Sequence, residues 1–355
     1  MIGSFRLPIS LTSSGDTTAP TITTAKVENA NPDKLVVVFS EVVTITNTTG
    51  LTITGAATPT LSAPTGGGSN TITFTLSTAL TNGQAVTLNV ASSNTIKDAA
   101  NNALAATTET ITNNVAAVTV IATGGTITQI TDGGVNYKVH TFTSSGAFAV
   151  TGPLDIQYLV VAGGGGGNNG INNGSSGGGG AGGLIYKDVA VTISSDQTIT
   201  IGSGGISGAN GGDSSLETLA ITIGGGRGGG EFVSYNGAIG GSGGGGGMKF
   251  GETGNGGAGT SPQGNAGSVA AALDGIRQGG GGGGFSAAAI DRFGGAGFVS
   301  SFDGTSKTYS KGGDSITDTN GIDAPANTGN GGEGAGSEGI GSKGGSGIVI
   351  IRYVT

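Results

Sequence analysis

Short apolar segments that alternate with polar residues dominate the first 115 positions of the chain. Alternation with a period of two is the pattern of a half-buried β-strand, and the Gly, Asn, Asp and Pro residues between the segments mark turns. Seven segments fit this pattern: 21–27, 35–39, 42–45, 51–54, 71–76, 85–90 and 107–112. Strands of this length and spacing predict a β-sandwich over residues 16–115.

A second block of alternating segments follows the sandwich. It comprises residues 125–130, 136–142 and 147–150, which predict a small β platform across 116–157. Beyond it strands are sparse, but 184–193 and 197–202 are separated only by Ser-Ser-Asp. Two strands joined by so short a connection predict a β-hairpin.

The stretch GIVIIRYVT, at 347–355, has the continuous apolar run of a buried strand. Helical periodicity is nearly absent, since only 270–274 and 286–291 look even briefly helical. We therefore expect an all-β protein. Its expected parts are an N-terminal docking arm, the sandwich, the platform and a glycine-rich domain closed by the last strand: 1–15, 16–115, 116–157 and 158–355.

Glycine is distributed very unevenly. Residues 1–150 contain 13 of the 78 glycines, so most of them lie in the second part of the chain. The longest runs are 163–167, 177–183, 224–230, 240–247 and 279–284. A flexible linker is the usual interpretation of such text, but well-patterned strands and a buried closing strand argue against it. Collagen needs glycine at every third position and much proline, and the chain has 8 prolines.

A bundle of polyglycine II helices is the remaining interpretation. Such a helix has three residues per turn and no hydrogen bonds of its own. Glycine segments without side chains can approach closely enough to exchange N–H···O=C bonds sideways, so the backbone itself becomes the packing surface. Small residues within the runs, such as Ala181 and Ser242, are compatible with that crowding, and we expect Arg227 to face outward.

Composition narrows the function classes. The sequence has no cysteine, which excludes disulfides and thiolate metal sites. A net charge of -8 opposes binding to phosphate backbones, so GGGRGGG at 224–230 is a weak nucleic-acid signal. No apolar run is long enough to span a bilayer. The N-terminal stretch lacks the pattern of a signal peptide, so we expect no membrane insertion and no export by the ordinary secretory route.

Four blocks of the first domain resemble bacterial Ig-like modules, which recur in surface proteins and phage virion proteins. They are DTTAP (16–20), LVVVFSEVV (35–43), LTNGQAVTLNV (80–90) and IKDAANNAL (96–104). One position departs from the family pattern, because Asn101 stands where an Asp-x-x-Gly-Asn turn has glycine. Asn also tolerates the left-handed conformation, so we expect the turn to survive. The resemblance implies a spacer or a weak surface binder.

The second part resembles the glycine-rich domains of tailed-phage fibre and virion proteins. The resemblance covers about 200 residues and rests on an ordered series of blocks: IQYLVVAGGGGG (156–167), GGAGGLIY (179–186), VTISSDQTITIGSGG (191–205), GGDSSLE (211–217) and GGSGIVIIRY (344–353). It implies a polyglycine core that presents variable loops to a receptor on the host surface.

Catalytic and metal-binding motifs are weak. His140 is the one histidine and falls on a strand, where a structural role is the expected one. Asp318, Asn320 and Asp323 lie near a glycine like part of a calcium loop, but the distal Glu of an EF-hand is missing, so we favour a solvated turn. We expect no enzyme, no cofactor and no metal site.

Aromatic residues and methionine between the glycine runs are the candidate receptor contacts, because such side chains are common at recognition surfaces. The alternative is that they cap the ends of the glycine bundle. The candidates are Phe232, Tyr235, Met248, Phe250, Phe285, Phe293, Phe298, Phe302 and Tyr309.

The leading hypothesis is a phage tail fibre or adhesin on the virion surface, assembled in the host cytoplasm. The arm would dock it to other virion proteins, the Ig-like domain would space it outward and the glycine-rich domain would contact a protein or glycan receptor. A capsid decoration or head fibre protein with a structural role is one alternative, and a bacterial surface adhesin is another. We expect a homo-oligomer, with a trimer as one candidate state, and no nucleic-acid partner.

Overall fold

The computed structural model of the chain describes residues 15–117, 120–170, 172, 174–230, 234–249, 252–273, 276–317 and 320–355. These residues form strands, turns and extended segments without a helix, which confirms the all-β prediction. The chain divides into two compact units, Met1–Thr119 and Val120–Thr355. The expected docking arm, apart from Gly15, lies outside the described residues.

The first unit contains seven strands around one apolar core. They are β1 (Ile22–Glu28), β2 (Lys34–Val43), β3 (Leu51–Gly55), β4 (Leu61–Thr65), β5 (Ser69–Leu76), β6 (Val86–Val90) and β7 (Thr107–Asn114), hydrogen-bonded in the order β3-β6-β7-β1-β2-β5-β4. Alternate residues are buried along β5 and β6, as their period of two requires. Val27, Leu35, Phe74 and Leu88 meet in the core. The arrangement is consistent with an Ig-like sandwich.

Two details of the first unit differ from the sequence prediction. Segment 35–39 and the first two residues of 42–45 belong to one strand, β2, whose register with β5 shifts between Val38 and Val43. Strand β4 was not predicted, because Pro64 reads as a strand breaker. The strand lies at the edge of the sheet, where a missing N–H costs no ladder bond. Asn101 has a φ of 74°, so the predicted left-handed turn is confirmed.

Two five-stranded sheets form the strand-rich end of the second unit. One has the order β13-β12-β23-β10-β9 and the other β16-β15-β14-β11-β8. Phe148, Ile199 and Leu216 of the second sheet pack with Val160 and Val349 of the first in a shared core. The strands are β8 (Ala122–Thr123), β9 (Thr126–Asp132), β10 (Val135–Phe142), β11 (Gly146–Val150), β12 (Leu154–Val161), β13 (Leu184–Ile193), β14 (Gln197–Thr200), β15 (Ser214–Leu216), β16 (Ala220–Thr222) and β23 (Ile348–Val354).

Strand β23 confirms the predicted closing strand and explains how the glycine region is held. It lies between β12 and β10, and six of its seven residues are buried. The chain leaves the sheet after β12, returns to it in β13, passes through the second sheet in β14–β16 and returns once more in β23. The platform strands within 116–157 and the glycine runs therefore belong to one unit, in which the glycine runs connect strands of the two sheets.

The predicted hairpin at 184–202 is wrong in its pairing, although both of its strands exist. Strand β13 pairs with β12 in one sheet, whereas β14 pairs with β11 and β15 in the other. Ile193 and Ile199 are both buried in the core between the sheets. Burial of Ile193 and Ile199 in the core between the sheets stabilises this arrangement more than a hairpin would. Ser-Ser-Asp therefore connects one sheet to the other.

The glycine segments are hydrogen-bonded sideways to one another. In the segment 177–183, every third N–H donates to the same neighbour: residues 177, 180 and 183 to carbonyls within 223–229, residues 178 and 181 to 280–283, and residues 179 and 182 to 329–332. A representative distance is 2.7 Å, from the nitrogen of Gly180 to the oxygen of Gly226. Successive N–H groups of one segment thus donate in turn to three neighbouring segments.

The close approach of these segments requires glycine. A Cβ at Gly165 would lie 2.2 Å from the oxygen of Gly226, and one at Gly245 would lie 1.9 Å from the oxygen of Gly280. Both distances are far below a van der Waals contact. Ala181 and Ser242 are fully buried, as expected of small residues inside the runs. Arg227 is only partly exposed, and its Nη1 donates to the oxygen of Gly228.

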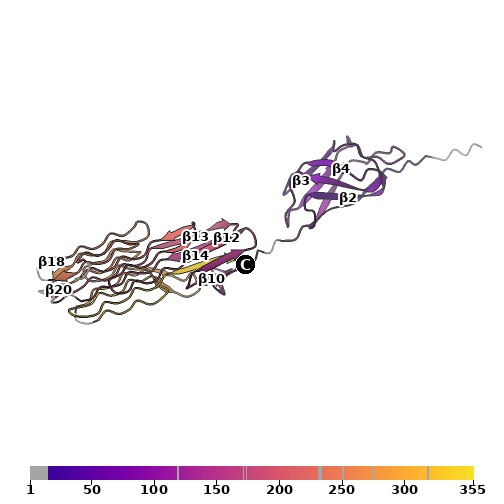
Figure 1. The fold of residues 1–355 in the computed structure, drawn as a ribbon. Helices are drawn as coiled ribbons and strands as arrows, with labels where there is room; N and C mark the ends of the chain where they lie inside the picture. The colour runs from indigo at the N-terminus through magenta and orange to yellow at the C-terminus, as the bar shows by residue number, and fades with distance from the viewer. Residues whose placement is uncertain are drawn as a thin grey trace, which may run out of the picture. The chain divides into compact units, whose positions relative to one another are not determined.

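Three further short strand pairs lie in the described part of the second unit. They are β17 (Met248–Lys249) with β18 (Glu252–Thr253), β19 (Ala271–Leu273) with β20 (Ile276–Gln278), and β21 (Phe298–Ser300) with β22 (Lys307–Tyr309). The segment 270–274, which looked briefly helical, therefore contains strand β19. Figure 1 shows the glycine segments running side by side from the end with β10, β12, β13 and β14 to the end with β18 and β20.

Candidate functional sites

The second unit has two chemically different ends. One end holds the two sheets, and the first strand of the unit, β8, belongs to it through its pairing with β11. The C-terminus lies at this strand-rich end in Figure 1, close to β10. The opposite end is made of connections between glycine segments, including the hairpins β17–β18 and β19–β20. We call this opposite end the loop end.

Five of the candidate receptor contacts are at least partly exposed among the described residues, and three of these are outside the apolar clusters that cover the sheets. Tyr235 and Met248 are partly exposed near the loop end, where the nitrogen of Gly247 donates to the oxygen of Tyr235 at 2.7 Å. Phe293 is 54% exposed, and the guanidinium of Arg292 lies 4.6 Å from its ring centre. These three remain candidate contacts. Phe232 and Phe250 lie outside the described residues.

The other four candidates gather on one face of the sheet that contains β23. Phe302 and Tyr309 are 3% and 1% exposed, so neither is available to a receptor. Phe285 and Phe298 are partly buried against the same core. The burial of Tyr309 also raises the pKa of its hydroxyl far above the ordinary value. For Phe302 and Tyr309 the prediction of surface contacts is therefore corrected: the apolar sheet face, which includes Leu159 and Ile350, needed a cover.

Arg352 fastens this cover to the sheet. Its guanidinium lies 4.3 Å from the ring centres of both Tyr137 and Phe302. Nε donates to Gln157 at 2.7 Å, and Nη1 donates to the carboxylate of Asp132 at 2.9 Å. A buried guanidinium with two aromatic faces and two polar acceptors is well satisfied. The function of Arg352 in the structure is therefore to position aromatic side chains, and it was not predicted.

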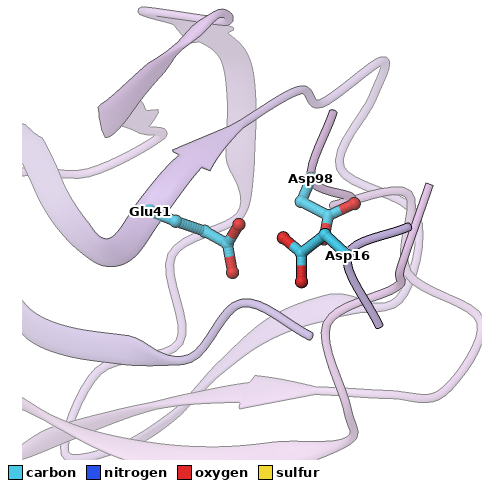
Figure 2. Close-up of side chains that lie close together, drawn as sticks. All are labelled: Asp16, Glu41 and Asp98. Carbon is cyan, nitrogen blue, oxygen red and sulfur yellow. The ribbon is translucent and has the colours of Figure 1, made fainter. Parts of the chain in front are cut away.

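The first unit contains a cluster of three carboxylates, Asp16, Glu41 and Asp98 (Figure 2). One oxygen of each lies within 4.8 Å of the others. Strand β2 carries Glu41, while Asp16 and Asp98 lie in connecting segments. Oxygen ligands at this separation have the chemistry that a hard cation such as Ca²⁺ requires. Asp98 is buried and already accepts bonds from the backbone N–H and the side-chain amide of Asn102, both at 2.7 Å.

The carboxylates of this cluster differ in their acidity. Desolvation, followed by the charges of Asp98 and Asp16, raises the pKa of Glu41 above its ordinary value. For Asp98 desolvation also acts upward as the largest single effect, but the hydrogen bonds from Asn102 and its neighbours outweigh it and lower the pKa. The hydrogen bonds to Asp98 therefore favour its anion, whereas burial and the neighbouring charges favour the protonated form of Glu41.

His140 lies in the core between the two sheets and is fully buried. Its Nδ1 is 2.7 Å from the oxygen of Gly124, and its ring packs against Phe148 and Tyr353. Desolvation lowers the pKa of His140, with smaller opposing and reinforcing effects from Gly124 and Lys138. Since the carbonyl accepts from Nδ1, Nε2 carries the lone pair of a neutral ring and has no hydrogen-bond partner. The ring serves the packing of the core.

The calcium-like residues at 318–323 are used differently in the fold. Asp318 lies outside the described residues. Oδ1 of Asn320 accepts the backbone N–H of Ile340 at 2.8 Å, and Oδ1 of Asp323 accepts that of Lys343 at 2.7 Å. Asn and Asp side chains accept backbone N–H groups of neighbouring segments at further places in the described residues, among them Asn169, Asn210, Asp213, Asn236, Asp314 and Asn330. These side chains complete the hydrogen bonding at the edges of the glycine region.

Sequence analysis missed both the carboxylate cluster and the edge residues, although part of the evidence for them is visible in the sequence. Asp16, Glu41 and Asp98 all fall within the blocks quoted above for their family resemblance, but their convergence depends on the fold. The edge residues could have been recognised from their spacing, since Asn320 and Asp323 are three apart, as are Ile340 and Lys343. A period of three places both pairs on matching sides of adjacent segments.

Comparison with known proteins defines both units. Residues 16–115 match the model of a bacterial Ig-like domain, and residues 141–354 match the model of a glycine-rich domain. A search of the curated proteins gave no match. No helix in the described part of the chain is long and apolar enough to cross a membrane. Because the second model covers more than half of the sequence, the chain belongs to the glycine-rich domain family and carries an Ig-like domain before it.

Proposed function

We propose that the glycine segments are polyglycine II helices packed into one stiff bundle. The supporting observation is the rotation of hydrogen bonds among three neighbours with a period of three residues, which a helix with three residues per turn produces. The predicted Cβ clashes at Gly165 and Gly245 support the same packing. Backbone groups buried in this way must be paired almost without exception, so the bundle has little freedom to bend.

The bundle is proposed to display its loop end away from an anchored strand-rich end. The observation that carries this proposal is the location of the C-terminus and the strands β10, β12, β13 and β14 at one end, with β18 and β20 at the other. Loops at the end of a rigid scaffold are free to vary in sequence without disturbing the core. Tyr235 and Met248 near the loop end, with Phe293, are the accessible residues proposed to contact a receptor.

The biological role proposed for this architecture is that of a phage virion protein, a tail fibre or adhesin on the particle surface. The arm at 1–15 would bind other virion proteins, and the Ig-like domain would act as a spacer. The role is non-catalytic and needs no cofactor. In support, His140 is packed in a core, and the accessible candidates are apolar and aromatic residues suited to binding a protein or glycan receptor.

Labelling of intact phage particles tests the virion assignment. Antibodies against the full chain should mark the surface of particles in electron micrographs, at the tail for an adhesin. Label at the capsid would support the decoration alternative, and particles without label would contradict both.

Competition for host cells tests the receptor contact. The purified full chain should reduce phage adsorption, and the triple substitution Tyr235→Ser, Met248→Ser and Phe293→Ser should remove most of that inhibition. The matched control is Ile206→Ser, which removes an exposed apolar side chain from another connection. Equal inhibition by both variants would contradict a contact through these three residues.

A further inference from the structure

Strand β9 is an exposed sheet edge without the usual protection. It pairs with β10 through seven consecutive residue pairs, from Thr126 opposite Thr141 to Asp132 opposite Val135, without a register shift. It lies last in its sheet, and all of its residues except Ile130 are exposed. Its sequence, TITQITD, contains no proline and no lysine. Such a strand offers a row of unpaired N–H and C=O groups to another strand.

The opposite edge of the same sheet is protected. Strand β13 pairs with β12 through a register shift between Ile156 and Tyr158, which interrupts the regular ladder. It also carries the exposed charged residues Lys187 and Asp188. A bulge and charged side chains are two of the devices that prevent edge pairing. The contrast within one sheet indicates that the open edge of β9 is not a general property of this fold.

We propose that β9 pairs antiparallel with β9 of a second copy of this chain. A full overlap of the seven residues places Gln129 on the two-fold axis and sets Thr126 opposite Asp132, Ile127 opposite Thr131 and Thr128 opposite Ile130. The one charged residue of the strand, Asp132, thus faces a hydroxyl and not a like charge, and it is already paired with Arg352 at 2.9 Å. β-Branched residues opposite one another favour such a pairing.

The pairing would join two sheets into one continuous sheet across the two copies. A two-fold contact uses the same surface on both copies, as self-pairing of one strand does. The expected homo-oligomer would then be a two-fold dimer, and not the trimer named as one candidate state. The dimer does not depend on the receptor contact, because β9 belongs to the strand-rich end.

Measurement of the mass of the full chain in solution tests the proposal. Light scattering after gel filtration should give twice the mass of one chain at micromolar concentration. Gln129→Lys puts two lysines against each other on the axis and should weaken the dimer about fivefold or more. The matched control is Val189→Lys on β13, where the side chain is 70% exposed, and it should leave the dimer unchanged. A monomer, or a dimer insensitive to Gln129→Lys, would overturn the proposal.

A cysteine cross-link identifies the register independently of dimer strength. Because the sequence has no cysteine, Gln129→Cys introduces a single thiol. On the axis of an antiparallel pair the two Cα atoms lie within the range that a disulfide bridges. Mild oxidation should therefore yield a covalent dimer of Gln129→Cys, and Val189→Cys should stay monomeric under the same conditions. If both variants cross-link equally, or neither does, β9 does not meet its copy and the proposal fails.

Discussion

The two units of this chain pack their backbones in different ways, one through apolar side chains and the other, in its glycine segments, through direct backbone contact. The Ig-like unit fills its interior with side chains such as Phe39, Ile72 and Leu88, which hold the strands apart. The glycine segments of the second unit have no side chains to fill space, so their backbones meet directly. In both units backbone N–H···O=C bonds join neighbouring strands or segments. The comparison teaches that a hydrophobic core is one of two ways to make backbone pairing compact.

The two kinds of core should respond differently to substitution. A side-chain core loses stability mainly when volume is removed, because a cavity remains. A backbone core has no volume to lose, and any added atom separates two chains that are hydrogen-bonded. The two units therefore make distinguishable predictions.

Addition of one methyl group between the hydrogen-bonded glycine segments is expected to have the largest effect. Gly245→Ala places a Cβ 1.9 Å from the oxygen of Gly280 and should lower the unfolding free energy of the second unit by roughly 4 kcal/mol or more. Gly67→Ala, where no atom lies within 4 Å, is the control in the first unit and should change stability by about 0.5 kcal/mol at most. Calorimetry of the full chain measures both. If Gly245→Ala left the unfolding transition of the second unit unchanged, direct packing of the glycine backbones would be refuted.

Substitution of the buried Arg352 should have the second largest effect, because its side chain connects the aromatic residues of the cover to the sheet. Arg352→Met keeps most of the side-chain volume but removes two aromatic contacts and two hydrogen bonds, at an expected cost of about 2 kcal/mol. Arg292→Met, whose guanidinium faces a single exposed ring, should cost about 0.5 kcal/mol. Equal melting temperatures for the two variants would show that Arg352 does not fasten the aromatic cover.

Acidification should weaken the second unit through His140. Its pKa is lowered in the folded protein, so below about pH 6.5 the unfolded chain binds a proton that the folded chain does not. Stability should therefore fall as the pH drops from 7 towards 5.5, by up to about 1 kcal/mol. Urea unfolding of wild type and His140→Phe separates this contribution, since the variant should lack it. Identical pH dependence in both proteins would exclude His140 as the source.

Removal of an edge acceptor should have the smallest effect. Asp323→Ala leaves the N–H of Lys343 without its side-chain partner and, because this bond is exposed, should cost about 0.5 kcal/mol. Asp323→Asn keeps the acceptor oxygen and should be close to wild type. Exchange of the Lys343 amide, followed by NMR, should accelerate only in the alanine variant. Acceleration in both variants would mean that the charge, and not the hydrogen bond, matters there.

The sequence predicted the parts of the fold that depend on local pattern. Strand positions in the first unit, the closing strand and the left-handed turn at Asn101 follow from alternation, burial and residue type. The sideways bonding of glycine segments followed from the need to pair buried backbone. Pairing partners were less predictable: β13 and β14 looked like a hairpin, but burial on two different sheets separated them.

The candidate contacts were predictable only by residue type. Tyr309 and Phe293 look equivalent in the sequence, because each lies close to a glycine run. The structure buries Tyr309 against the sheet face and leaves Phe293 more than half exposed. The difference depends on where each connection crosses the unit, and no local pattern records that position.

Hydrogen exchange of backbone amides in the full chain tests the central claim most directly. If the glycine segments form an ordered, laterally bonded core, the amides of 163–167, 177–183 and 279–284 should exchange as slowly as those of the central strand β23. The connections that contain Tyr235 and Met248 should exchange faster. Exchange of the three glycine segments at the rate of an unstructured chain, with β23 protected, would contradict the account.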